Sequence, residues 1–305
     1  MDTTTVSVRE KRSGNRKDGY LVRESDVMHA FMPFLMPNRA DNEAVLTMQA
    51  DLTAVKEYLT KKNAENPEFK YTFFHVICAA LAKTIVLRPN MNRFYAGNRL
   101  YDRKDIIFSF VVKKQFADDG AESLAILKVN RDGDVSPVEQ IYTRVKDIVY
   151  SVRKEEQVDG TTDKMGILLH MPRPVLRFFM GMLRWLDYHG RYPDALMHDD
   201  PYFSTIFISN LGSIRMDANY HHLTNWGTNS IFVVIGEKRR IPFYGKDGSV
   251  SIREGLELSM TVDERIADGL YYANTIHLLK HLLYHPELLD LPIGTPVSDA
   301  EEGED

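Results

Sequence analysis

The chain has 305 residues, of which 44% are hydrophobic and 27% are charged, and its formal net charge is −5. These values are typical of a soluble globular protein with enough material for a large buried core. The negative net charge gives no reason to expect a nucleic acid as partner.

The two ends of the chain differ in composition from the part between them. Residues 1–19 are polar and lack the apolar region of a secretion signal, so we expect a disordered N-terminal segment and a cytoplasmic protein. Residues 294–305 are acidic and lack core material, which predicts a disordered tail. Residues 20–293 are expected to form one domain. The single cysteine, Cys78, lies in an apolar run and is expected to be a buried thiol.

From residue 44 onward, strand and helix patterns alternate in chain order. Asp51 and Thr72 are placed to cap two helices, the second ending at Arg88-Pro89. Gly97-Asn98 predicts the turn of a hairpin within residues 94–101. Further strands are expected at residues 44–50, 106–112, 123–129, 205–209, 231–235 and 256–262.

Two helices in the second half have clear signals. Ser136-Pro137-Val138-Glu139 provides a cap, a first-turn proline and a capping-box glutamate. A final helix is predicted to end before Pro286. Its inward positions are expected to be Leu270, Ala273, Ile276, Leu279 and Leu283. The pattern as a whole predicts one α/β domain with a mixed sheet.

The C-terminal half contains three stretches that together, and in this order, are similar to the motifs of a known family. They are Phe207-Ile-Ser-Asn-Leu-Gly212, Ile231-Phe-Val-Val-Ile-Gly236 and Asp263-Glu-Arg-Ile-Ala-Asp-Gly269. They resemble the catalytic domain of the CoA-dependent acyltransferases of 2-oxo acid dehydrogenase complexes, which share their fold with chloramphenicol acetyltransferases. In that family the last stretch reads Asp-His-Arg-x-x-Asp-Gly. Glu264 therefore occupies the position of the catalytic histidine.

The resemblance implies a two-layer α/β sandwich that assembles as a homotrimer, with each active site at a boundary between protomers. It implies coenzyme A or an acyl-CoA as substrate. Carried over by position, Ser209 would donate to the tetrahedral oxyanion and Asp268 would hold the turn through an ion pair. Glu264 would stand where the catalytic base belongs.

The chain also departs from the family. Nothing in it resembles a lipoyl domain or the subunit-binding domain, so we expect no covalently bound lipoyl group and leave open a separate lipoyl-bearing protein. Residues 164–198 are read as an insertion. Its amphipathic part, residues 174–187, is interpreted as a lid or a protomer contact. Arginines beside aromatic residues also suit a membrane surface, which we do not favour.

Two interpretations of Glu264 remain open from the sequence. Burial in an apolar channel raises the pKa of a carboxylate, so Glu264 is a candidate base for a thiol or hydroxyl. Alternatively, the site has lost its chemistry and the fold serves a non-catalytic trimeric scaffold or binding protein. His221 and His222, between two strands, are less favoured replacement bases. His277, His281 and His285 are read as a solvent-facing stripe, and no metal site is predicted.

Overall fold

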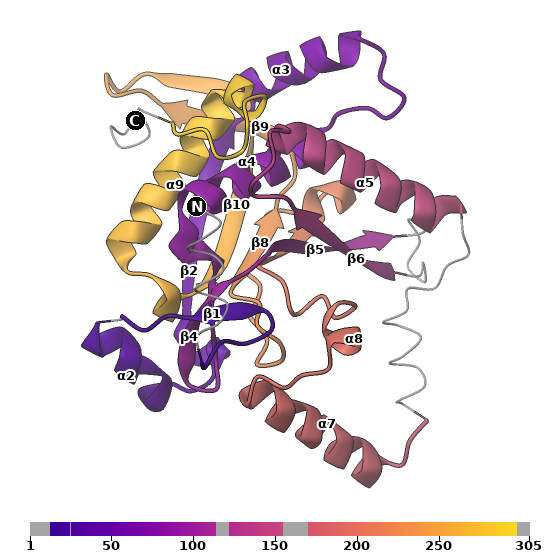
Figure 1. Ribbon diagram of the computed structural model, residues 1–305. Coiled ribbons are helices and arrows are strands. Elements are labelled where there is room, and N and C mark those ends of the chain that lie inside the picture. Colours follow the sequence, from indigo (N-terminus) through magenta and orange to yellow (C-terminus); the bar gives the residue numbers. More distant parts are fainter. Residues whose placement is uncertain (1–12, 25, 114–121, 155–169, 298–305) are drawn as a thin grey trace.

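The computed structural model describes residues 13–24, 26–113, 122–154 and 170–297 (Figure 1). Within these ranges one large mixed sheet has the order β2-β10-β8-β7-β5-β6, and β9 pairs with β10. Strands β7 and β8 run parallel, as do β5 and β7, while the other pairs are antiparallel. A smaller sheet has the order β1-β4-β3. The strands are β1 (Gly19–Leu21), β2 (Glu43–Asp51), β3 (Arg93–Ala96), β4 (Arg99–Arg103), β5 (Ile106–Lys113), β6 (Glu122–Val129), β7 (Ile206–Asn210), β8 (Ile231–Ile235), β9 (Arg239–Tyr244) and β10 (Val250–Asp263).

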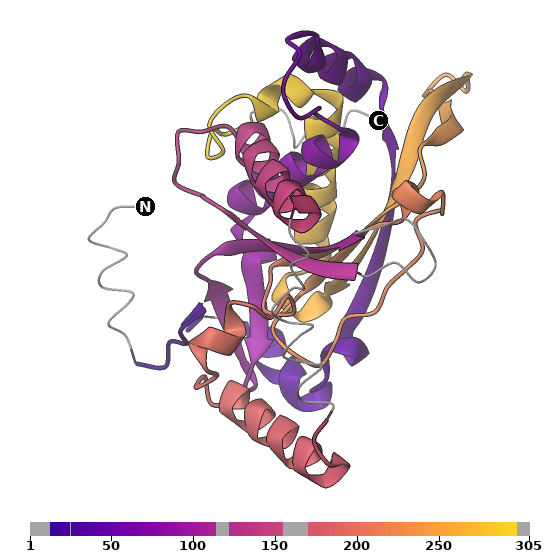
Figure 2. The ribbon, with the colours of Figure 1, turned by 90° about the vertical axis from the view of Figure 1, so that its right-hand side faces the viewer.

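Helices form the second layer. Those of the described residues are α2 (Val27–Leu35), α3 (Thr53–Ala64), α4 (Phe73–Leu87), α5 (Pro137–Lys154), α7 (Arg173–Tyr188), α8 (Asp194–Met197) and α9 (Gly269–Tyr284). Helices α3, α4, α5 and α9 lie together on one face of the large sheet (Figure 2). Helices α2 and α7 lie at the bottom of the view in Figure 1, at the end of the molecule away from α3 and α5. The predicted two-layer α/β sandwich with a mixed sheet is confirmed. No helix among the described residues is long and apolar enough to cross a membrane.

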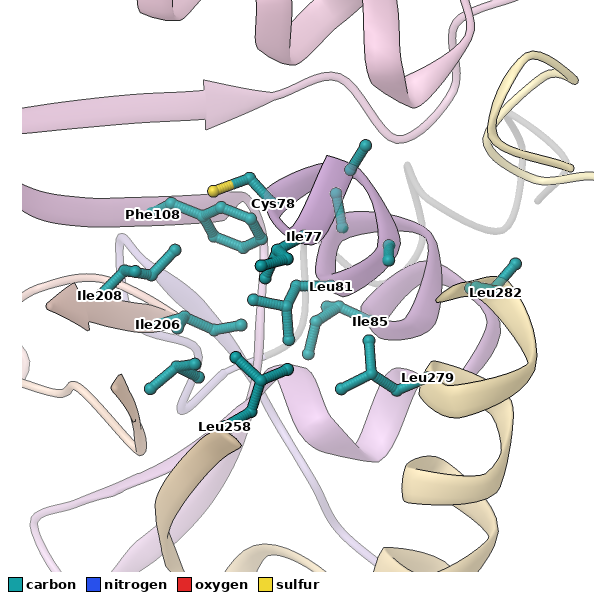
Figure 3. Close-up of a cluster of buried hydrophobic side chains, with 14 of the residues drawn as sticks. Ile77, Cys78, Leu81, Ile85, Phe108, Ile206, Ile208, Leu258, Leu279 and Leu282 are labelled. Atoms are coloured by element: carbon teal, nitrogen blue, oxygen red, sulfur yellow. The ribbon is translucent and has the colours of Figure 1, made fainter. Parts of the chain in front are cut away.

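The core lies between the sheet and its helical layer. Helix α4 is apolar on nearly all sides, and its side chains meet those of β7, β10 and α9 (Figure 3). Cys78 is buried there beside Phe108, as predicted, and burial raises the pKa of its thiol. Such a thiol is a packing group and not a nucleophile.

Local sequence signals explain how these elements begin and turn. Thr72 caps α4 in a reciprocal capping box with His75. The hairpin between β3 and β4 turns at Gly97 and Asn98, both with positive φ. A Cβ on Gly97 would lie 2.3 Å from the carbonyl oxygen of Tyr188, so glycine allows the hairpin to approach the end of α7.

Two expectations need correction. Leu270 is 73% exposed and Ala273 is also exposed, because the first turn of α9 borders a cavity and the buried face begins at Tyr272. Residues 13–19 are ordered, because Arg16 is buried and pairs with Asp18 and with Asp187 of α7. Residues 1–12 and 298–305 lie outside the described residues.

Candidate functional site

The turn after β10 is built around a buried carboxylate. Asp263 is 0% exposed and pairs with Arg265 through two contacts of 2.7 Å, from Nε to Oδ1 and from Nη2 to Oδ2. A second buried guanidinium, that of Arg39, has its Nε 3.7 Å from Asp263 Oδ2. Burial lowers the pKa of Arg39. A fully buried charge requires such partners, so this cluster fixes the shape of the Glu264–Ile266 turn.

Helix α2 is held at two points, by Tyr95 of β3 and by Arg265 of this turn. Pro33 has no backbone N–H, so the carbonyl of His29 lacks its helical donor. The hydroxyl of Tyr95 donates to that carbonyl instead, at 2.6 Å. At the end of the helix, Arg265 Nη1 donates to the carbonyl of Met36 at 3.1 Å, and its guanidinium lies over the Tyr95 ring. Helix α2 therefore has a fixed position relative to the turn.

A cavity of about 500 Å³ lies between α2, the turn and the start of α9. Its walls are mainly apolar, with Met32 and Leu46 among them. The side chains with polar or charged groups that line it include His29, Glu264 and Asp268. An apolar cavity with a few convergent polar groups is the usual form of a small-molecule site.

The predicted residues Glu264 and Asp268 both line this cavity, and both side chains are exposed. Asp268 caps α9, since its carboxylate accepts a hydrogen bond of 2.8 Å from the backbone N–H of Tyr271. The ion pair within this turn is the one between Asp263 and Arg265. Asp268 thus positions the start of α9, and Asp263 provides the carboxylate of the ion pair in this turn.

The third predicted residue, Ser209, lies at the other end of the sheet. It pairs in register with Val234 of β8, which pairs with Ser259 of β10. Ser259 and Glu264 are five positions apart along the chain, roughly 16 Å in an extended strand. Two strand spacings of about 4.8 Å add to that separation. Ser209 and Glu264 therefore do not meet within one chain.

The other histidines lie elsewhere. The ring of His221 stacks on Phe232 with centroids 4.0 Å apart, and neither His221 nor His222 lines the cavity. At the C-terminal end of α9, the rings of His281 and His285 lie 4.6 Å apart. Among the described residues, no group of three or more His, Cys, Asp or Glu side chains is arranged to hold a metal ion.

Sequence reasoning missed the contribution of α2. His29 and its partner Asp26 lie within a segment that was given no role, and His29 faces the same cavity as Glu264. The available signal was an aspartate three residues before a histidine at the start of an apolar run, which is a helix-capping pattern. By itself that pattern does not indicate a site.

The insertion forms a wall beside the turn. The inner face of α7 packs through Leu183 against Tyr192 and Phe203, in a small apolar cluster. A second cavity, of about 290 Å³, lies between α7, the β3–β4 hairpin and the buried Arg39 and Arg265. The outer face of α7 is exposed at Val175, Phe178, Met182 and Trp185. Residues 164–169 of the predicted insertion lie outside the described residues.

The mixed sheet, the helical layer on one face and the turn after β10 define a chloramphenicol acetyltransferase-like acyltransferase fold. Residues 194–291, about a third of the chain, match the sequence profile of the 2-oxoacid dehydrogenases acyltransferase (catalytic domain) family. The family resemblance drawn from the sequence is thereby confirmed. No curated protein matches the chain in sequence.

Solved structures show the same fold at low identity. A probable dihydrolipoamide acetyltransferase from Listeria monocytogenes 4b F2365 is 15% identical with a TM-score of 0.56, covering 90% of this chain and 96% of its own. The dihydrolipoamide acetyltransferase of Azotobacter vinelandii is 17% identical with a TM-score of 0.55, covering 88% and 94%. A chloramphenicol acetyltransferase is 10% identical with a TM-score of 0.54, covering 87% and 99%.

Proposed function

We propose that this protein transfers acyl groups from coenzyme A to a small acceptor. The observation that carries the proposal is the cavity of about 500 Å³ at the turn after β10, with Glu264 and Asp268 in its wall. Glu264 occupies the position of the family's catalytic histidine, and the fold and the match over residues 194–291 support the same chemistry. For the Azotobacter vinelandii protein, a serine, a histidine and an asparagine four residues after that histidine have been investigated for roles in its catalytic mechanism. Ser209, Glu264 and Asp268 are the residues of this chain proposed for those positions.

The proposed site is shared between copies of the chain. Ser209 and Glu264 lie at opposite ends of the sheet, so a complete set of these residues requires two protomers. The outer side of α2 exposes Val27, Phe31, Phe34 and Leu35, and Leu270 is exposed at the start of α9. Apolar groups gathered in this way indicate an association surface. A homotrimer satisfies both observations, with one site at each boundary.

In this site the acceptor thiol, hydroxyl or amine attacks the thioester carbonyl of the acyl-CoA. The Ser209 hydroxyl of one protomer donates to the oxyanion of the tetrahedral intermediate. Asp268 of the other holds the first turn of α9 against the cavity through its cap. The carbon–sulfur bond then breaks, and the proton that the acceptor gives up on attack passes to the sulfur, so that coenzyme A leaves as its thiol.

The remaining partners follow from the same proposal. Coenzyme A acts as a substrate and no covalently bound lipoyl group is required, since the acceptor is either a small molecule or the lipoyl group of a separate protein. We place the protein in the cytoplasm, where acyl-CoA is available.

A direct test is a screen of acyl-CoA substrates against small thiols, hydroxyls and amines, with release of the free CoA thiol as the readout. The proposal predicts turnover that exceeds acyl-CoA hydrolysis for at least one acceptor class. Calorimetry with coenzyme A provides a second readout. Binding without transfer to any acceptor would favour a non-catalytic binding protein, and the absence of both would favour a trimeric scaffold.

A further inference from the structure

The cavity beside Glu264 contains a histidine that the family resemblance does not assign. His29 of α2 lines the same cavity as Glu264 and Asp268, and it forms a pair with Asp26. We propose that His29, oriented by Asp26, is the general base of this site and replaces the histidine absent at position 264. This inference rests on the acyl transfer proposed above.

The chain holds His29 at the cavity through its backbone. Asp26 caps α2, since its Oδ1 accepts a hydrogen bond of 3.1 Å from the backbone N–H of His29. The carbonyl of His29 accepts from Tyr95 at 2.6 Å, because Pro33 provides no N–H for it. The same backbone segment therefore has both its N–H and its carbonyl fixed. The backbone position of His29, from which its imidazole extends, is therefore fixed by the buried Tyr95.

The Asp26–His29 pair also selects the form of the imidazole. His29 Nδ1 contacts Asp26 Oδ2, and the backbone hydrogen bond from His29 lowers the pKa of Asp26. An ionised carboxylate only accepts hydrogen bonds, so Nδ1 carries the proton and donates it. Nε2 then holds the lone pair that accepts a proton. A carboxylate that orients a histidine and stabilises its charged form is the arrangement found in hydrolytic triads.

The chemistry of the two candidates favours the histidine over Glu264. Ionised, the carboxylate of Glu264 can only accept hydrogen bonds, whereas the imidazole of His29 can take a proton at one nitrogen while the other stays bonded to Asp26. In a protein that keeps its cavity but has glutamate at the family's base position, His29 provides the missing proton acceptor.

The proposed step is balanced within the site. Nε2 of His29 takes the proton of the acceptor hydroxyl or thiol as its oxygen or sulfur forms a bond to the thioester carbon. The tetrahedral intermediate then expels the coenzyme A sulfur. The imidazolium returns the proton to that sulfur, which leaves as the thiol. Neutral imidazole is restored without any further reactant.

Steady-state transfer by the full-length protein tests the inference through three variants. His29→Gln keeps a side chain of similar size and should lower kcat by roughly 100-fold or more, with coenzyme A binding unchanged by calorimetry. Asp26→Asn retains a good helix cap and should cause a smaller loss. Glu264→Gln should lose less than about tenfold, since it leaves the base in place. His198→Gln, exposed and outside the cavity, is the matched control and should keep the native rate.

Chemical rescue separates catalysis from a structural role. In His29→Ala, free imidazole should restore part of the rate, whereas a fold defect would not respond. An unchanged rate in His29→Gln, or a larger loss in Glu264→Gln than in His29→Gln, would overturn the assignment of the base and leave acyl transfer standing. A native protein without any acyl transfer would overturn both proposals.

Discussion

At the scale of single residues, a buried ion pair sets the shape of the turn after β10. Asp263 and Arg265, on either side of Glu264, form a buried bidentate pair that keeps the turn in shape. The sequence motif predicted the turn and the position of Asp268. It did not predict that Asp263 carries the charge pair, because burial of a residue at the end of a strand depends on the distant Arg39.

Loss of one partner from this pair should be costly. Arg265→Met leaves Asp263 charged and buried beside Arg39 alone, and it also removes the contact to the carbonyl of Met36. We expect the free energy of unfolding to fall by about 3–5 kcal/mol, measured by urea denaturation. The control is Arg239→Met, which breaks surface pairs with Asp217 and Glu257 and should cost less than about 1 kcal/mol. Equal losses in the two variants would contradict the account of the turn.

At the scale of elements, hydrophobic periodicity and caps predicted most helices and strands close to their observed ends. The capping residues Thr72 and Ser136 and the turn at Gly97-Asn98 carry their signals locally, so one sequence suffices to find them. The inward face predicted for α9 holds at Leu279 and Leu283 and fails at Leu270, which is apolar yet exposed, because a periodicity pattern cannot show where along a helix the buried part begins. The role of α2 was missed because it depends on contacts with Tyr95 and Arg265, which are distant in sequence.

Burial of His75 at the start of α4 makes stability depend on pH. His75 Nδ1 accepts from the backbone N–H of Thr72, and burial lowers the pKa of His75 from 6.5 to about 4. Between these values the unfolded chain binds a proton that the folded chain does not. The free energy of unfolding should therefore fall as the pH falls from 6.5 to about 4, by on the order of 3 kcal/mol for this group.

A substitution isolates this effect. His75→Gln keeps a side chain that suits the third helical position of a capping box and does not titrate. Denaturant unfolding at several pH values should show a weaker pH dependence in this variant. An identical pH dependence in both proteins would show that His75 does not contribute.

At the scale of the whole molecule, the proposed site is complete only in an assembly. The cavity with His29 and Glu264 lies at one end of the sheet, and Ser209 lies at the other. The sequence motifs placed these residues in one family site, while the strand register shows that one chain cannot bring them together. Apolar groups of α2 and α9 remain exposed in the single chain and are available for protomer contacts.

Co-expression of two inactive variants tests this shared site most directly. Ser209→Ala and His29→Gln should each form trimers by light scattering, and each alone should transfer acyl groups far more slowly than the native protein. In mixed trimers, a boundary that takes His29 from one variant and Ser209 from the other is intact. Random mixing of equal amounts should then restore roughly a quarter of the native rate. A mixture no more active than the two variants measured separately, or a protein that stays monomeric, would contradict a site built from two copies of the chain.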